Sequence, residues 1–335
     1  MLRKIRELAT RPDRLAKAGR SGDHLVPILV DNTGRDGSTL MMRLLATSPQ
    51  IAAPGPYPYE WKYFAYLWRW SRLIERRDKS DLWTEGDLAS LAQEPYKPIM
   101  GPPRWSPSLL RSADAAQSPM SRQVFDLAWH EFSRRAAKQV REEHGDPNAD
   151  VRYYAEKHQD TWLVDLDELP PLKVTVLLRD SRDTFVSFHA FDAKRRQESG
   201  GRFEAALPGR LETEEDRTMR FIERERERLR WIAGLPDDAR FRLFRYEDLV
   251  TDLPRQAHRL EDWLSVRVDP EAAAGDPEMR RVHVSAESPE ASVGRWEREM
   301  GRDLVQLFSR ELAGELEAVG YRAGGRTLPS QAPPR

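Results

Sequence analysis

The hydrophobic positions of the chain form short apolar runs and longer amphipathic stripes, and the two kinds alternate. The runs at residues 26–30 and 172–178 are nearly continuous and rich in β-branched side chains, which is typical of parallel strands buried on both faces. Residues 241–246 alternate between apolar and polar, as a half-buried strand does. Residues 51–53 and 151–156 are two further candidate strands. Helical patterns separate these runs, so the order predicts an α/β fold with a central parallel sheet.

The helix signals follow the strands closely. Apolar residues recur at helical spacing after the first strand, at Leu40, Met41, Leu44 and Leu45. A helix is predicted from Ser121 to about residue 143, with an apolar stripe made of Leu127, Ala128, Phe132, Ala136 and Val140. Thr213 opens another with a capping box. Two more helices are predicted: one that ends at Leu264, and one that spans residues 297–318.

The first strand and its helix are joined by Asn-Thr-Gly-Arg-Asp-Gly-Ser-Thr, residues 32–39. A small, polar turn between a strand and a helix makes an anion site, because backbone N–H groups converge there and the helix dipole favours negative charge. Gly34 and Gly37 allow the backbone to come close to a ligand, and Ser38 and Thr39 add hydroxyl donors. The loop therefore predicts a phosphate site, although the same arrangement also occurs as an ordinary turn.

The phosphate loop of nucleoside triphosphatases needs a lysine after its last glycine, and here Ser38 follows Gly37. Arg35 is the only strong cation of the loop. With its Arg-x-Gly-Ser-Thr order, the loop resembles that of the sulfotransferase family, which binds the 5′-phosphosulfate of 3′-phosphoadenosine 5′-phosphosulfate (PAPS) there. The resemblance implies a cofactor loop and names Arg35 as catalytic. Asp36 departs from the family pattern, which usually has a small residue. The cofactor-binding candidates of this loop are Gly34, Arg35, Asp36, Gly37, Ser38 and Thr39.

A second motif begins where the 172–178 strand ends, at Arg179-Asp180-Ser181-Arg182-Asp183. Taken alone it is a helix start with Ser181 as N-cap. It also resembles the 3′-phosphate motif of the sulfotransferases, in which an arginine at the strand end and a serine on the helix hold the phosphate. Arg179 and Ser187 occupy those positions, while Ser181 stands where the family usually has proline. The two motifs occur in the family's order.

Weaker resemblances add four residues, three of which have an ordinary structural alternative. Glu60 resembles the family's catalytic base, or it complements a helix dipole. Lys157 resembles a family lysine, or it is a solvated charge at a strand end. Tyr246, in Arg-Tyr-Glu-Asp-Leu, is expected near the adenine, or it is a core tyrosine. Arg295, in Gly-Arg-Trp, is expected at the 3′-phosphate. His189 is the alternate base, and a helix-surface histidine is its other interpretation.

Composition limits the partners. The 54 Lys and Arg residues against 55 Asp and Glu give a net charge of −1, which argues against a general nucleic-acid binder. With no cysteine there is no disulfide or thiolate metal site, and the seven histidines are scattered, so no metal is expected. No apolar run approaches the about 18 residues of a membrane span, and the N-terminus lacks a signal core. We expect a cytoplasmic protein.

The resemblance implies a single domain over residues 26–322, a three-layer sandwich with P-loop-like topology and a helical insertion at about residues 57–150. An N-terminal helical arm, residues 1–25, precedes it, and a disordered tail, residues 323–335, follows. A mobile loop is predicted over residues 192–212. Tyr96 and Trp105 lie in a proline-rich stretch and either line an acceptor cleft or seal the core.

The resemblance implies a PAPS-dependent sulfotransferase that acts on a hydroxyl or amine of a small-molecule, carbohydrate or lipid acceptor. Two alternatives stay open: a P-loop nucleotide kinase or hydrolase, and a nucleotide-binding relative without turnover, which Asp36 keeps in view. The acceptor and the oligomeric state do not follow from the sequence.

Overall fold

The computed structural model describes residues 24–53, 59–73, 120–159, 169–199, 213–275 and 288–322. Residues 1–23 of the predicted arm, Tyr96, Trp105 and the tail lie outside the described residues, and those predictions are untested. No helix within the described ranges is both long and apolar enough for a membrane span.

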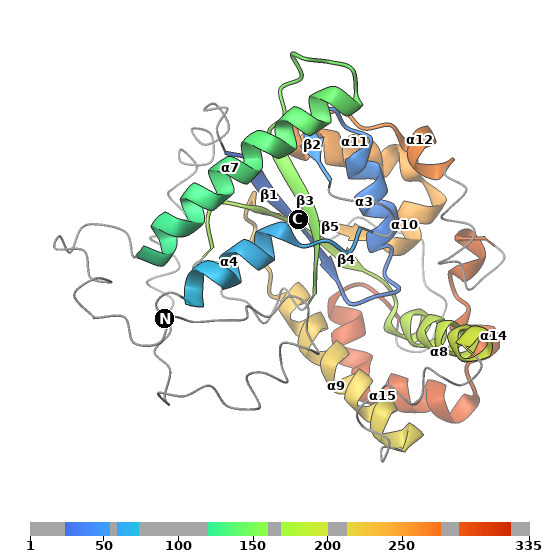
Figure 1. Cartoon of the computed structure of the whole chain (residues 1–335). Coiled ribbons are helices and arrows are strands. Elements are labelled where there is room, and N and C mark those ends of the chain that lie inside the picture. Colours follow the sequence, from blue (N-terminus) through green and yellow to red (C-terminus); the bar gives the residue numbers. More distant parts are fainter. Residues whose placement is uncertain are drawn as a thin grey trace, which may run out of the picture. The chain divides into compact units, whose positions relative to one another are not determined.

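The chain forms a five-stranded sheet in the order β2-β3-β1-β4-β5 (Figure 1). Its strands are β1 (Val26–Asn32), β2 (Ile51–Ala52), β3 (Tyr153–Gln159), β4 (Lys173–Leu178) and β5 (Phe241–Arg245). The pairs β2–β3 and β4–β5 are parallel, which confirms the predicted α/β class. Because β1 stands between β3 and β4, the strand order reverses there. In open parallel sheets, ligands bind outside the carboxyl end of the strand at that reversal, which is where the β1 loop begins.

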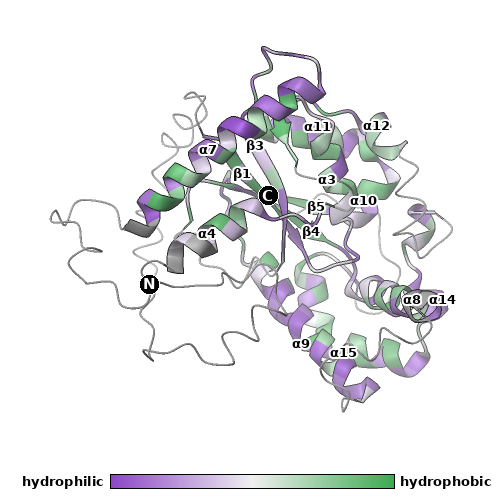
Figure 2. Ribbon diagram, in the orientation of Figure 1, coloured by the Kyte–Doolittle hydropathy of each residue, from purple (hydrophilic) through white to green (hydrophobic). Residues whose placement is uncertain are grey.

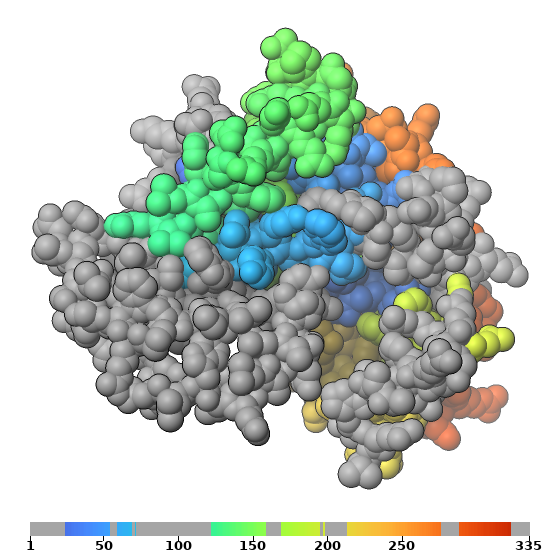
Figure 3. Space-filling view, in the orientation of Figure 1, coloured from blue at the N-terminus to red at the C-terminus, as the bar shows by residue number. Residues whose placement is uncertain are grey.

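The chain consists of two compact units. The first comprises Met1–Ile28 and Pro49–His158 and holds β2, β3 and two helices, α4 (Tyr63–Leu73) and α7 (Met120–Glu143). The two helices pack against each other and lie side by side in Figure 3. Aromatic rings fill their contact, with Phe64 5.3 Å from Trp129 and Trp129 5.3 Å from Tyr154 of β3. These rings form the core of this unit.

The apolar stripe of α7 differs from the predicted one. Leu127 is 73% exposed, and the buried side chains are Phe125, Trp129, Ser133, Ala137 and Val140. These positions repeat every three or four residues, so they form a face that is rotated from the predicted stripe. Green and purple segments alternate along α7 in Figure 2. The prediction was wrong because Ser133 and Trp129 face the core and donate or accept hydrogen bonds there, at Leu25.

The second unit comprises Leu29–Ser48 and Gln159–Arg335. Its longer helices are α3 (Ser38–Ala46), α8 (Ser181–Ser199), α9 (Glu214–Ala233), α11 (Leu253–Leu264) and α15 (Arg302–Ala318). Its short ones are α10 (Tyr246–Thr251), α12 (Pro270–Ala274), the 3₁₀ turn η3 (Glu290–Ser292) and α14 (Trp296–Glu299). Helices α9 and α15 lie side by side (Figure 1). The buried Ile222 and Leu229 of α9, and Phe308 and Leu312 of α15, supply apolar core.

Three helix boundaries in the structure differ from the predicted ones. Helix α8 continues to Ser199, so residues 192–199 are not loop; a solvent-exposed helix is as polar as a loop, and polarity misled the prediction. The predicted helix over 297–318 is two helices, because Gly301 adopts an extended backbone between α14 and α15. Ser181 is the first residue of α8 rather than its cap, and the side chain of Asp180 accepts the N–H of Arg182 at 3.0 Å. The capping box at Thr213 is confirmed.

Candidate functional site

The loop between β1 and α3 has an unusual backbone. Gly34, Arg35 and Gly37 have φ angles of 86°, 60° and 93°, all in the left-handed region. Glycine tolerates this region, but an arginine is strained there. These residues lead into α3, which begins at Ser38, and Thr39 lies in the first turn of that helix. Such successive turns bring backbone N–H groups toward one concave side.

Two side chains inside the loop fix this shape. The carboxylate of Asp36 accepts the N–H groups of Thr33 at 2.7 Å and of Ser38 at 3.1 Å. The side-chain oxygen of Asn32 accepts the Gly34 N–H at 2.7 Å and the Ser38 hydroxyl at 3.1 Å. Asp36 is 1% exposed, so its charge is turned into the loop. Asp36 therefore shapes the backbone of the loop, and its contact with a cofactor stays a prediction, as does that of Ser38.

The two glycines of the loop are also required by packing. A Cβ on Gly37 would lie 2.7 Å from Cδ2 of Tyr246, and one on Gly34 would lie 2.9 Å from Cζ of Phe188. Both distances are shorter than carbon atoms allow. The loop is therefore pressed against α8 and against the tyrosine that the sequence analysis placed near the adenine.

Arg35 reaches from the loop to α8. Its Nε donates to Oγ of Ser187 at 3.0 Å, and its guanidinium lies 4.7 Å from the centre of the Phe191 ring. Burial lowers the pKa of Arg35, and the nearby charge of Arg179 lowers it further. The two predicted motifs, which are far apart in sequence, thus meet at this arginine.

Arg179 connects three segments. Its Nη1 donates to the Arg35 carbonyl at 2.6 Å, and its Nη2 donates to the Ser292 carbonyl at 2.8 Å. The guanidinium stacks on the Tyr246 ring, 4.1 Å from its centre. The Tyr246 hydroxyl lies 2.7 Å from the Ser292 hydroxyl. The Nε of Arg179 is buried and has no hydrogen-bond partner among the described residues, so the site retains an unsatisfied cationic donor.

Arg295 completes a group of arginines. It is 5% exposed and pairs with Glu299 at 2.7 Å, and this hydrogen bond raises the pKa of Arg295. Its charge also contributes to lowering the pKa of Arg35. Arg35, Arg179 and Arg295, together with Ser187 and Tyr246, are the predicted ligands that the fold of the second unit gathers. We call the three arginines the arginine cluster.

Solved structures similar to the chain are known, although no family model and no curated protein matches it. The sulfotransferase domain from the curacin biosynthetic pathway has a TM-score of 0.42 at 15% identity, covering 86% of this chain and 97% of its own. The sulfotransferase domain from the Synechococcus PCC 7002 olefin synthase has 0.42 at 17%, covering 87% and 96%. Retinol dehydratase in complex with androsterone and inactive cofactor PAP has 0.40 at 13%, covering 92% and 86%.

The predicted resemblance to sulfotransferases is found again here. At these identities and scores the likeness is distant, and it assigns no ligand and no residue role to this chain.

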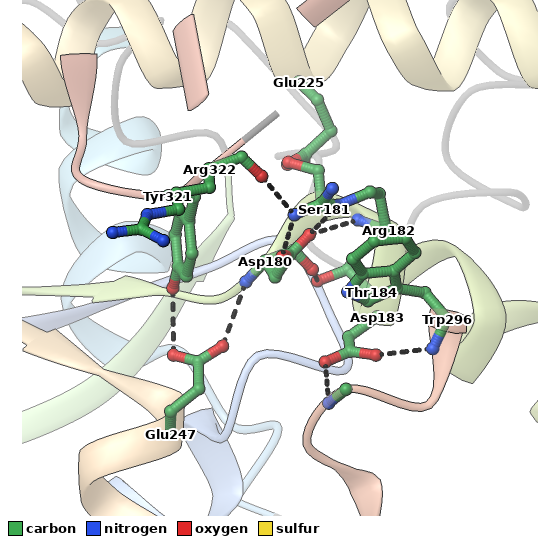
Figure 4. A network of polar contacts seen from close by, with 11 residues as sticks. Asp180, Ser181, Arg182, Asp183, Thr184, Glu225, Glu247, Trp296, Tyr321 and Arg322 are labelled. Carbon is green, nitrogen blue, oxygen red and sulfur yellow. Dashed lines mark hydrogen bonds and ion pairs between the residues drawn. The ribbon is translucent and has the colours of Figure 1, made fainter. Parts of the chain in front are cut away.

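A polar network that the sequence analysis missed supports the second motif (Figure 4). Asp183 accepts the N–H groups of Gly294 at 2.7 Å and Trp296 at 3.0 Å, and so holds the turn that carries Arg295. Arg182 pairs with Asp180 at 2.7 Å, and both are fully buried. The guanidinium of Arg182 also lies 3.8 Å from the Trp296 ring centre. The available signal was the group of charged residues that follows Arg179, namely Asp180, Arg182 and Asp183.

Two candidate bases remain. In the first unit, Oε1 of Glu60 lies 2.7 Å from Nζ of Lys157, which is 3% exposed and stands within β3 rather than at its end. The side chain of Glu60 is 49% exposed. In the second unit, His189 is half exposed and lies 3.4 Å from Glu214. Glu60 therefore has a buried cationic partner, whereas His189 pairs on the surface.

A cavity of about 860 Å³ opens beside Thr33, between α8 and α9. Phe185, Phe188 and Phe221 line it together with charged residues of both helices. This volume lies in the usual range for small-molecule sites. In the part of the chain that the structure describes, no three His, Cys, Asp or Glu side chains are grouped to hold a metal ion.

Proposed function

We propose that this chain transfers a sulfuryl group from PAPS to a hydroxyl or amine of an acceptor. The observation that carries the proposal is the arginine cluster at the β1–α3 loop. Arg179 donates to the Arg35 carbonyl, and burial, followed by the nearby charges of Arg179 and Arg295, lowers the pKa of Arg35. Like charges in such a place disfavour one another, and a bound polyanion removes that cost.

The residues of the second unit fit a doubly anionic nucleotide. The loop and Arg35 would hold the 5′-phosphosulfate, and Arg179, Ser187 and Arg295 would hold the 3′-phosphate. The unsatisfied Nε of Arg179 is a donor for such an anion. The Ser187 hydroxyl accepts a hydrogen bond from Arg35, which places it beside the loop cation. Tyr246 would lie near the adenine.

PAPS supplies an activated sulfuryl group when it is bound. During transfer, negative charge grows on the phosphate oxygen that leaves, and preorganised donors at that position carry much of the catalysis. We assign this role to Arg35 and the loop N–H groups. Glu60 would take the proton of the acceptor as a general base, and Lys157 would hold its carboxylate in place. No metal is assigned a role.

The first test separates this proposal from a nucleotide kinase or hydrolase. Calorimetry should show 3′,5′-adenosine bisphosphate binding at least tenfold more tightly than ATP with magnesium, because Ser38 replaces the lysine that a triphosphate needs. Tighter binding of ATP with magnesium would make the kinase alternative correct.

Arg179→Ala should weaken binding of the bisphosphate by more than tenfold. Removing one partner of a desolvated charge pair costs roughly 2–5 kcal/mol, and this variant also releases the Arg35 carbonyl. Arg230→Ala is the matched control, since that arginine is exposed on α9 and pairs with Glu315. Equal affinities for the two variants in calorimetry would show that Arg179 is not a ligand.

The acceptor is to be found by mass spectrometry, as an added sulfuryl group in host extract supplied with PAPS. We propose a small-molecule, carbohydrate or lipid acceptor. Bisphosphate binding without any transfer across such an extract would instead support a nucleotide-binding relative without turnover.

A further inference from the structure

Glu156 is a buried carboxylate in the middle of β3, where a strand normally carries an apolar side chain. It is fully buried, and its oxygens accept the N–H groups of Phe64 at 2.9 Å and Ala65 at 3.0 Å. It also accepts the hydroxyl of Tyr154 at 3.1 Å. Burying an ionised carboxylate is costly unless its hydrogen bonds are made, so these three donors define what Glu156 does.

Two of these donors, the N–H groups of Phe64 and Ala65, belong to the first turn of α4. That turn contains no acidic residue of its own, and the N–H groups at a helix start have no partner within the helix. Here the Tyr63 N–H donates to the Tyr154 hydroxyl at 3.2 Å, and the next two N–H groups donate to Glu156. Two side chains of β3 therefore cap α4 from outside.

This cap bears directly on Glu60. Glu60 lies three residues before α4 and is the nearest preceding carboxylate in the sequence. A helix N-terminus attracts such a charge, which is the ordinary role that the sequence allowed for Glu60. Because Glu156 already occupies the α4 N-terminus, the Glu60 carboxylate instead lies 2.7 Å from Lys157, the residue after Glu156.

We propose that Glu156 is a positioning residue: by capping α4 it keeps the Glu60 carboxylate on Lys157. This rests on the proposed function, in which Glu60 is the general base. Without Glu156, Glu60 would turn toward the exposed N–H groups of α4 and leave Lys157.

The decisive variant is Glu156→Gln, which keeps the size of the side chain but removes its charge and one of its acceptors. Hydrogen exchange followed by mass spectrometry should show amides 63–66 exchanging at least tenfold faster than in the wild type. Acetylation of Lys157, which is buried and paired with Glu60, should rise at least fivefold, to the level expected for Glu60→Ala, which lacks the covering side chain. The unchanged reactivity of Lys157 alongside faster exchange would overturn the proposal.

Two further variants serve as an alternative and as a control. If Glu156→Gln does not fold, Tyr154→Phe removes only the hydroxyl of the cap and should raise both signals to a smaller extent. Glu247→Gln is the matched control, a buried carboxylate of the second unit that accepts from the Tyr321 hydroxyl at 2.9 Å. It should leave exchange at 63–66 and the labelling of Lys157 unchanged, and a similar response would make the effect a general loss of stability.

Kinetics distinguish this proposal from the proposed function. Glu156→Gln should lower kcat about tenfold and leave the KM for PAPS within twofold. The double variant with Glu60→Gln should be no slower than Glu60→Gln alone, since one residue acts through the other. An additional loss in the double variant would overturn the positioning role. A Glu60→Gln enzyme with wild-type turnover would show that the proposed base is wrong, whatever the labelling of Lys157.

Discussion

Arg35 is the residue with the strongest local conflict. Its φ of 60° is unfavourable for any side chain, and it stands between Gly34 and the buried Asp36. The surrounding structure fixes this geometry, because Arg179 binds its carbonyl and Ser187 accepts from its side chain. Strained backbone of this kind persists where a side chain must be aimed, and clusters at functional sites. An arginine is retained at a position where glycine would be easier.

Two substitutions separate the charge of Arg35 from its strain. Arg35→Ala and Arg35→Gly should both lower kcat far more than they raise the KM for PAPS, because the cation is needed most as the leaving oxygen becomes anionic. The glycine variant should be more stable than the alanine variant by up to about 1 kcal/mol, since only alanine keeps the left-handed strain. Steady-state kinetics and urea unfolding measure the two effects. A large rise in KM with normal kcat would make Arg35 a ground-state ligand.

Glu60→Gln tests the proton transfer itself. The amide keeps the shape and can still accept a hydrogen bond from Lys157, but it takes no proton. A general base contributes roughly 10²–10⁴-fold, so transfer should slow at least a hundredfold while bisphosphate binding stays normal. If Glu60 only complements the α4 dipole, the variant should lose about 0.3–1 kcal/mol of stability and keep its activity. Turnover near the wild-type rate would direct attention to His189 or to the acceptor.

Among the elements, the β1–α3 loop depends most on its neighbours. Its interior is fixed by Asn32 and Asp36, and its outer surface is pressed against Tyr246. The loop, the tyrosine and Arg179 form a stack in which each member determines the position of the next. We therefore expect a change in the loop to displace Tyr246, at the adenine end of the predicted nucleotide site.

Gly37→Ala should weaken binding of 3′,5′-adenosine bisphosphate at least tenfold. The added Cβ would lie 2.7 Å from Cδ2 of Tyr246, and the φ of 93° is strained for alanine, so either the ring or the loop must shift. Calorimetry measures the affinity, and a melting curve shows whether the fold survives. Gly314→Ala, at a glycine of α15 with open space around its Cβ, is the control and should bind normally. Normal binding by Gly37→Ala would show that this contact is not part of the site.

At the scale of the whole molecule, the buried carboxylates of Glu156 and Glu247 make the stability depend on pH. Burial raises the pKa of Glu156 to about 7 and that of Glu247 to about 7. Their ordinary value is 4.5, so the folded protein binds more protons than the unfolded chain between these two limits. Stability must therefore fall as the pH rises from about 4.5 to about 7 through these groups.

Glu247→Gln removes one of these titrations. The wild type should lose stability relative to this variant as the pH rises from 4.5 to 7.5, by up to about 3 kcal/mol, because one pKa unit corresponds to about 1.4 kcal/mol. The variant also loses a hydrogen bond to Tyr321 or to Asp180, which lowers its free energy of unfolding by an amount that does not depend on pH. Urea unfolding at several pH values measures the difference. A difference that stays constant across this range would show that Glu247 does not titrate there.

The sequence by itself determined the α/β class, because nearly continuous β-branched runs that alternate with helical stripes are typical of strands buried on both faces. It also identified the loop and the Arg179 motif, since glycines and hydroxyls after a strand are local features. The face that α7 buries could not be predicted, because Trp129 and Ser133 face the core through hydrogen bonds to the backbone of Leu25. The role of Asp36 could not be predicted either. A carboxylate looks the same in sequence whether it turns toward a ligand or into its own loop, and only the folded backbone, with φ of 86° at Gly34 and 93° at Gly37, decided that it turns inward.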